Sequence, residues 1–206
     1  MRYIVLLLLP LSVHAQNLQV VYPPVIYFEY WNPGDSTHRG PFLMKLEADL
    51  SSPKDNIGKS YVQFSQAIRF WKPKVYLAVQ YSGGLGTNYS IANAYSIGVS
   101  VPFSGYNLLV LYTYNAFPRP SQDPLVSFYW WKGLHHYKWE LSGDINGYTL
   151  NKNPHGKWLC FFGEPQLWYN VCKHLSLGAR VNLYYNDLAL DNCFQWGPTI
   201  GLKYKL

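Results

Sequence analysis

The chain has 206 residues, a formal net charge of +6, and a composition that is 14% charged, 49% apolar and 18% aromatic. Soluble domains usually have about 25% charged residues, so this composition disfavours an ordinary soluble domain. The basic residues are spread along the chain without a Lys/Arg block, which disfavours nucleic acid as a partner.

The first fifteen residues, MRYIVLLLLPLSVHA, have the features of a secretory signal peptide. They contain one arginine, an apolar run from Ile4 to Leu11 and a Val13-x-Ala15 ending, so we expect cleavage after Ala15. The run is too short for a retained membrane helix, which needs about 20 apolar residues. The sequence therefore predicts a signal peptide at residues 1–15 and one exported domain at residues 16–206.

The mature sequence alternates apolar and polar residues along nearly its whole length, which is the period of half-buried β-strands. No segment keeps a 3.6-residue period, and glycine and proline lie mostly between the runs. We therefore expect an all-β protein. The predicted strands lie at 17–22, 25–31, 41–50, 59–71, 74–83, 93–103, 106–115, 125–132, 136–150, 157–171, 175–185 and 193–206.

The stretch KWELSGDINGY, residues 138–148, poses the question of which strand face meets water. Trp139, Leu141 and Ile145 share one face of the extended chain, and the charged side chains share the other. In a soluble sandwich the apolar face would point into a core. In an outer-membrane barrel the apolar face would point to lipid and the charged face to the lumen.

The connections between the predicted strands answer this question, because tight and long connections alternate. The tight ones are KPK, SGY, GLH and CKH, and longer ones such as SSPKDNIG and NKNPHG lie between them. Up-and-down transmembrane barrels have this asymmetry, with short periplasmic turns and longer external loops, whereas Greek-key sandwiches have no reason for it. We therefore expect an antiparallel up-and-down transmembrane β-barrel of about twelve strands. Its first strand is short and is followed by Pro23-Pro24.

Several motifs resemble a known family. GPFLMKLEADLSS resembles the second-hairpin motif of Tsx-like nucleoside-specific channels, and QAIRFWK, VQYSGGLG, LSGDING, FFGEPQLWYN and GPTIGLKYKL are similar to successive motifs of a smaller Tsx-related outer-membrane family of unassigned function. The resemblance covers most of the mature chain and implies a monomeric twelve-stranded barrel. For the nucleoside channels themselves it implies a narrow lumen lined with aromatic and ionisable side chains. This chain departs from them in its shorter loops and in an N-terminal aromatic cluster reduced to YFEYW.

Strand parity assigns a set of polar and aromatic residues to the lumen. This set is Glu29, Lys45, Glu47, Asp49, Tyr61, Gln63, Arg69, Gln80, Lys138, Glu140, Asp144, Glu164, Gln166, Trp168, Arg180, Asn182, Tyr184 and Lys203. One interpretation is that these groups pair with one another and fill a narrow barrel, because a buried unpaired charge is costly. The other is that they form weak sites for a small, flat, polar solute, with aromatic faces for stacking and polar groups for hydrogen bonds.

Seven of these residues are candidates for solute binding. They are Glu29, Glu47, Tyr61, Arg69, Glu164, Trp168 and Arg180. No catalytic residue, metal ligand or cofactor is predicted. The function that we expect is an outer-membrane channel for small hydrophilic solutes. The resemblance to Tsx-like channels implies nucleosides as the solute. The alternatives are a closed structural or adhesive barrel and a barrel-embedded lipid-modifying enzyme.

The remaining expectations concern partners and cysteines. Cationic loop segments such as SSPKDNIGK would lie near lipopolysaccharide phosphates, so outer-membrane lipid and lipopolysaccharide are the expected surroundings of a monomeric barrel. Cys160, Cys172 and Cys193 are odd in number and match no metal motif, and we expect them to be unpaired.

Overall fold

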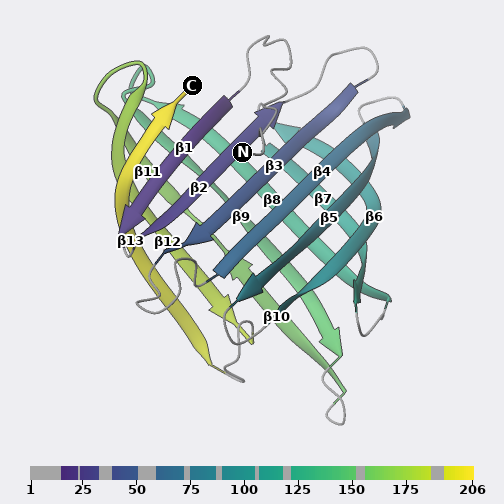
Figure 1. The fold of residues 1–206 in the computed structure, drawn as a ribbon. Coiled ribbons are helices and arrows are strands. Elements are labelled where there is room, and N and C mark those ends of the chain that lie inside the picture. The colour runs from purple at the N-terminus through teal and green to yellow at the C-terminus, as the bar shows by residue number, and fades with distance from the viewer. Residues whose placement is uncertain are drawn as a thin grey trace, which may run out of the picture.

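The fold is a single closed antiparallel sheet (Figure 1). The computed structural model describes residues 15–22, 24–32, 39–50, 59–71, 75–86, 90–104, 107–117, 122–151, 156–186 and 193–206. Its strands are β1 Ala15–Tyr22, β2 Val25–Asn32, β3 Arg39–Asp49, β4 Lys59–Trp71, β5 Val75–Gly86, β6 Ser90–Ser104, β7 Asn107–Phe117, β8 Gln122–Leu134, β9 Trp139–Asn151, β10 Lys157–Gly163, β11 Gln166–Asn170, β12 Leu175–Tyr185 and β13 Phe194–Lys205. Within these ranges, no helix is long and apolar enough to cross a bilayer.

Each strand pairs with its neighbour in the sequence, and the sheet closes where β1 pairs with β13. At this seam Asn17 lies opposite Lys205, and Tyr22 lies opposite Ile200. The strand β1 therefore forms two ladders, and the closure of the barrel depends on it. We call the end of the barrel that holds Asn17 and Lys205 the terminal end, and the opposite end the far end.

The segments β10 and β11 are two parts of one barrel strand. Both pair with β9 and with β12, and Glu164-Pro165 separates them. Backbone hydrogen bonds still join the neighbouring strands at the break. The Glu164 N–H donates to the Asp144 carbonyl at 2.8 Å, and the Val181 N–H donates to the Pro165 carbonyl at 3.0 Å. The barrel therefore has the predicted twelve strands, although the continuous strand predicted at 157–171 is interrupted by a proline that cannot donate to a ladder.

The two faces of the wall carry opposite kinds of side chain, as parity predicts. Exposed residues on the outside include Leu46, Ile97, Leu141, Leu167 and Leu202. The lumen holds buried polar residues, among them Gln19, Gln63, Gln80, Asp123, Glu140, Asp144, Glu164, Gln166, Arg180 and Lys203. Apolar outside and polar inside is the arrangement of a transmembrane barrel, and it confirms the outward prediction for Trp139, Leu141 and Ile145.

One lumen assignment is wrong. Lys138 was predicted to start the inward face of a strand at 136–150, but it lies exposed in the turn that precedes β9. His135, His136 and Tyr137 have positive φ values of 47°, 55° and 63°, so the chain reverses through this segment and the ladder begins only at Trp139. Alternation in the sequence continues through the turn, and this is why parity misplaced Lys138.

Glycine allows close packing where the wall meets a large lumen side chain. A Cβ atom on Gly178 of β12 would lie 2.2 Å from the Leu167 carbonyl oxygen and 2.7 Å from Trp168 Cε3. Trp168 is fully buried and packs with Val21, Val25 and Tyr27. The missing side chain at position 178 therefore makes room for the indole against the neighbouring strand.

Residues 1–14 lie outside the described residues, so cleavage after Ala15 stays a prediction. Of the four predicted tight turns, those at GLH and CKH lie in described residues and connect β8 to β9 and β11 to β12. The segments SSPKDNIG and KPK also fall outside the description. No disulfide joins the three described cysteines, of which Cys160 is buried and Cys172 and Cys193 are exposed.

Candidate functional site

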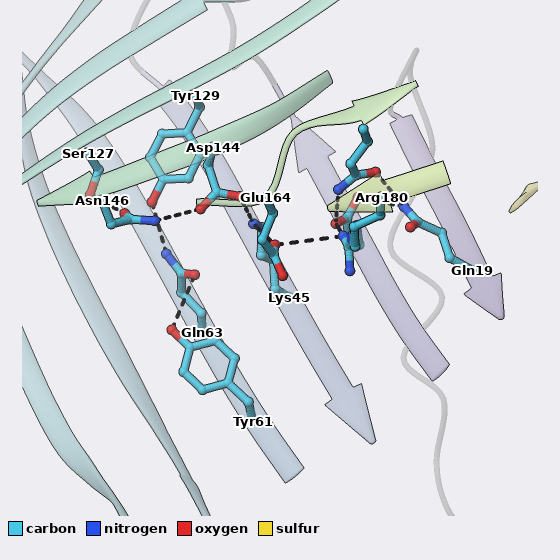
Figure 2. A network of polar contacts seen from close by, with 12 residues as sticks. Gln19, Lys45, Tyr61, Gln63, Ser127, Tyr129, Asp144, Asn146, Glu164 and Arg180 are labelled. Carbon is cyan, nitrogen blue, oxygen red and sulfur yellow. Dashed lines mark hydrogen bonds and ion pairs between the residues drawn. The ribbon is translucent and has the colours of Figure 1, made fainter. Parts of the chain in front are cut away.

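Five charged side chains meet in the lumen and form what we call the central network: Glu29, Lys45, Asp144, Glu164 and Arg180 (Figure 2). They come from β2, β3, β9, the break between β10 and β11, and β12. Within the network three carboxylates face two cations, which leaves a formal surplus of one negative charge. The network therefore carries a formal charge and is not a neutral cluster.

Lys45 joins opposite walls of the barrel. Its ammonium group contacts Asp144 on β9, which is six strands from β3 in a barrel of twelve, and it lies 3.1 Å from Glu164 Oε2. The Lys45 side chain is 13% exposed, whereas those of Asp144 and Glu164 are 3% and 5% exposed. A pair held this far from water satisfies its own charges but gains little net stability, because desolvation offsets the attraction.

Arg180 is the most enclosed member of the network. Its Nη2 donates to Glu29 Oε1 at 2.7 Å and lies 3.7 Å from Glu164 Oε2. Its Cζ lies 3.7 Å from the centroid of the Tyr27 ring, which places the guanidinium over an aromatic face. The side chain is fully buried. Arg180 therefore has a fixed position between the β2 and β12 walls.

Hydrogen bonds extend the central network toward β1. Gln19 Nε2 donates to Glu29 Oε2 at 3.0 Å, and Gln166 Nε2 donates to Glu29 Oε1 at 3.4 Å. Trp168 Nε1 in turn donates to Gln166 Oε1 at 3.0 Å. Glu29 thus accepts from three strands besides its own, which fixes its carboxylate even though its side chain is 16% exposed.

On the other side of Lys45 the network continues through amides and hydroxyls. Asn146 Nδ2 donates to Asp144 Oδ2 at 2.6 Å, and Ser127 Oγ donates to Asn146 Oδ1 at 2.6 Å. Gln63 Nε2 donates at 3.0 Å both to Gln80 Oε1 and to the hydroxyl of Tyr129. Figure 2 shows Tyr61 and Tyr129 at the two ends of the contacts of Gln63. Aromatic and amide groups therefore border the central network.

Two smaller ionic groups lie toward the ends of the barrel. Near the terminal end, Glu140 contacts Lys203 and lies 2.8 Å from the Lys205 ammonium. Lys203 Nζ also lies 4.9 Å from the centroid of the Trp168 ring. Toward the far end, buried Asp123 pairs at 2.7 Å with Lys157, whose side chain is 52% exposed. The Glu140 group is connected to the central network through Trp168 and Gln166, which donates to Glu29.

The structure brings three of the seven predicted solute-binding residues together. Glu29, Glu164 and Arg180 lie in the central network. Glu47 and Tyr61 are paired in register on β3 and β4, and the Tyr61 hydroxyl lies 3.5 Å from Gln63 Oε1, so both border the network.

The other two predicted residues lie elsewhere. Arg69 is six residues along β4 from Gln63, which is about 20 Å at ~3.3 Å per residue. Trp168 lies inside the lumen as predicted, but its exposed fraction is 0%, so other side chains cover its ring. In this arrangement it supports Gln166 and Lys203 and offers no ring face to a solute.

Sequence reasoning missed three contributors to the site. Lys45 and Asp144 were assigned to the lumen but not to the site, because parity gives the face of a residue and not its height. Gln19 was not assigned at all, because it lies on the short first strand. The signal that could have found it is the alternation of NLQVVY, which places Gln19 opposite the outward Leu18 and Val20.

The chemistry available here is that of ion pairing and hydrogen bonding. Among the described residues, no group of three or more His, Cys, Asp or Glu side chains has the arrangement of a metal site. The described histidines His135, His136 and His174 are exposed in turns outside the lumen. The central network can attract, orient and hydrogen-bond a small polar molecule, and we find no general base beside a nucleophile in it.

Comparison with known proteins gives one family and a set of similar folds. A family model described as "Domain of unknown function (DUF5020)" matches residues 42–206. The chain is similar to a solved structure of the NanC porin, with 10% identity, a TM-score of 0.52, and coverage of 94% of this chain and 100% of that one. It is also similar to the KdgM porin, with 7% identity, a TM-score of 0.50, and coverage of 94% and 98%. No curated protein matches the chain significantly.

Proposed function

The chain belongs to the DUF5020 family and folds as a twelve-stranded transmembrane barrel, and from this premise we propose that it is an outer-membrane channel for the diffusion of small hydrophilic solutes. The central network is the constriction of this channel. The barrel resides as a monomer in the outer membrane of a Gram-negative-type cell envelope, among lipid and lipopolysaccharide, after export by the signal peptide.

The observation that carries this proposal is the group of charged side chains that meet across the lumen in the central network. A barrel with only a structural role could fill its interior with apolar side chains and avoid the desolvation cost of buried charge. Here Lys45, Asp144, Glu164, Arg180 and Glu29 bring charge from facing walls to one level. Charged rings and clusters at a constriction are a common means of selecting a solute in a pore.

Nucleosides are the finer proposal for the solute. They are flat, small and rich in donors and acceptors, and a tyrosine beside the network can supply an aromatic face for stacking. Tyr61 is the candidate, because it is only partly buried, whereas Tyr129 is buried and Arg180 covers the ring of Tyr27. The resemblance of several sequence motifs to Tsx-like channels supports the same solute.

A closed barrel without transport is the second candidate, and one observation favours it. The contact between Lys45 and Asp144 crosses the lumen, and Gln19, Ser127 and Arg180 are fully buried there. A lumen held shut at this level would make the protein a structural or adhesive barrel. A lipid-modifying enzyme has less support, because the described histidines lie in exposed turns.

Liposome swelling tests the channel directly. The refolded protein is placed in liposomes, and swelling rates in adenosine or thymidine are compared with those in a sugar of similar size. Faster and saturable entry of the nucleosides would support a selective channel, and equal entry at rates that follow solute size would support a general one. No swelling, in protein whose heat-modifiable gel migration shows it to be folded, would contradict the channel and favour the closed barrel.

Two variants separate the residues near the constriction from the rest of the lumen. Glu47→Gln changes a carboxylate that borders the central network, and Arg69→Gln changes a lumen cation eight residues along β4 from Tyr61, the partner of Glu47, which is about 26 Å at ~3.3 Å per residue. We expect Glu47→Gln to alter saturable flux more than Arg69→Gln. Unchanged flux in both variants of a conducting barrel would remove Glu47 and Arg69 from the proposed solute path.

A further inference from the structure

The two cations of the central network are held very differently. Arg180 is fully buried, is paired with Glu29 and lies over Tyr27. Lys45 is the more exposed of the two, and its ammonium group stands at the end of a flexible side chain between Asp144 and Glu164. A cation that enters the lumen could therefore replace Lys45 at these carboxylates far more readily than it could replace Arg180.

The surroundings of Asp144 and Glu164 suit a cation. The two carboxylates lie on adjacent strand segments, and both contact the same ammonium group. The Tyr129 ring centroid lies 6.0 Å from Lys45 Nζ, which is within cation–π range. An anion at this position would meet the surplus negative charge of the network, so the chemistry favours an amine.

The network also has unused hydrogen-bonding capacity. Among the described residues, Oε1 of Gln19 and Nε and Nη1 of Arg180 are buried without a hydrogen-bond partner. Both side chains are fully buried, and Figure 2 shows them beside the charged groups. Buried polar groups usually have partners, and a solute with its own donors and acceptors would supply them.

We propose that the pair Asp144 and Glu164 is a binding site for the ammonium group of a small amino-bearing solute, and that Lys45 occupies this site until such a solute displaces it. Displacement also removes the link between β3 and β9, so binding and opening of the lumen are one event. This inference rests on the proposed channel function and adds the class of solute.

Calorimetric titration of the refolded full-length mature barrel with 1,4-diaminobutane tests the site without any need for conduction. We expect the wild type to bind the diamine and the double variant Asp144→Asn/Glu164→Gln to lose detectable binding. Lys45→Gln removes the internal competitor and should bind about tenfold more tightly, the equivalent of one charge-assisted hydrogen bond. Butane-1,4-diol, of the same length without charge, should not bind.

The matched control is Lys132→Gln. It makes the same change of charge at an exposed residue on the outside of β8, away from the lumen. Affinity for the diamine should be unchanged in this variant. Equal affinity in Lys45→Gln, Lys132→Gln and the wild type would overturn the displacement by Lys45, and equal affinity in the carboxylate variant would overturn the site.

Planar-bilayer currents in a potassium chloride gradient give the second measurement. The wild type should be selective for cations, Lys45→Gln should conduct more, and Asp144→Asn/Glu164→Gln should shift the reversal potential toward chloride. Current with an unchanged reversal potential in the carboxylate variant would overturn this inference and leave the channel intact. Diamine binding without current in any folded variant would instead contradict the channel and leave the amine site intact.

Discussion

The guanidinium of Arg180 lies over the ring of Tyr27, with 3.7 Å between Cζ and the ring centroid. Tyr27 is 4% exposed, so this cation–π contact is shielded from water. We expect Tyr27→Leu to lower the free energy of unfolding by about 2 kcal/mol, measured by urea titration in lipid vesicles. The control is Tyr22→Leu, at an exposed tyrosine of the neighbouring strand β1. This variant should change the free energy of unfolding far less.

Gly178 should not tolerate even a methyl group. A Cβ atom there would meet the Leu167 carbonyl at 2.2 Å, and because this is backbone of the neighbouring strand, the wall itself must shift. We expect Gly178→Ala to cost about 1 to 3 kcal/mol and to lower the temperature of the heat-modifiable transition. Gly197→Ala is the matched control, because nothing lies within 4 Å of a Cβ atom at that position. Equal transitions in the two variants would argue against the packing of Trp168 described above.

A charged substitution on the outer face of a strand can test whether that face contacts lipid. Ile97 of β6 is 56% exposed and lies within the apolar band. Ile97→Arg should cost about 2 to 4 kcal/mol of folding free energy in a bilayer, whereas Phe194→Arg, where β13 begins, should cost about 1 kcal/mol or less. Folding yield into vesicles of defined thickness measures the difference. If Ile97→Arg folded as well as the wild type, the outside of β6 would not face lipid.

Labelling of the two exposed cysteines can establish the orientation of the barrel in the membrane. Cys172 is exposed in the turn between β11 and β12 at the terminal end, and Cys193 is exposed before β13 at the far end. With short turns in the periplasm, a membrane-impermeant maleimide added to intact cells should label Cys193 and spare Cys172. Cys193→Ser should abolish this labelling, and buried Cys160 should react only after unfolding. Labelling of Cys172 in intact cells would reverse the assigned orientation.

Much of the fold could be predicted because a barrel wall has a period of two. Parity alone placed Glu140, Asp144, Arg180 and Lys203 inside and Leu141 outside, and all five have these positions in the structure. The twelve strands followed from counting the alternating runs with an even total, and the up-and-down topology followed from the alternation of tight and long connections. The exceptions were local: the turn at His135 to Lys138 and the break at Glu164-Pro165. In both segments the sequence keeps alternating between apolar and polar residues, although the backbone there is not part of a strand.

The site was less predictable, because contacts across a lumen depend on strand tilt and stagger as well as on face. Lys45 and Asp144 are almost a hundred positions apart, and only the closure of the sheet sets β3 opposite β9. Arg69 was also assigned to the lumen, but it lies six residues along β4 from Gln63 and so at another height of the barrel. Parity therefore identified the members of the lumen, and three-dimensional register selected which of them meet.

The seam between β1 and β13 makes the barrel dependent on the first and the last of its described strands. Asn17 and Lys205 are paired although nearly the whole sequence lies between them, so this ladder requires the largest loop closure in the molecule and favours slow folding. Until that ladder forms, β1 and β13 each present an unpaired edge on which another chain can add strands. Loss of either strand would therefore leave an open sheet with two unpaired edges rather than a smaller barrel. Such a truncated protein should aggregate in the cell envelope and be degraded by proteases.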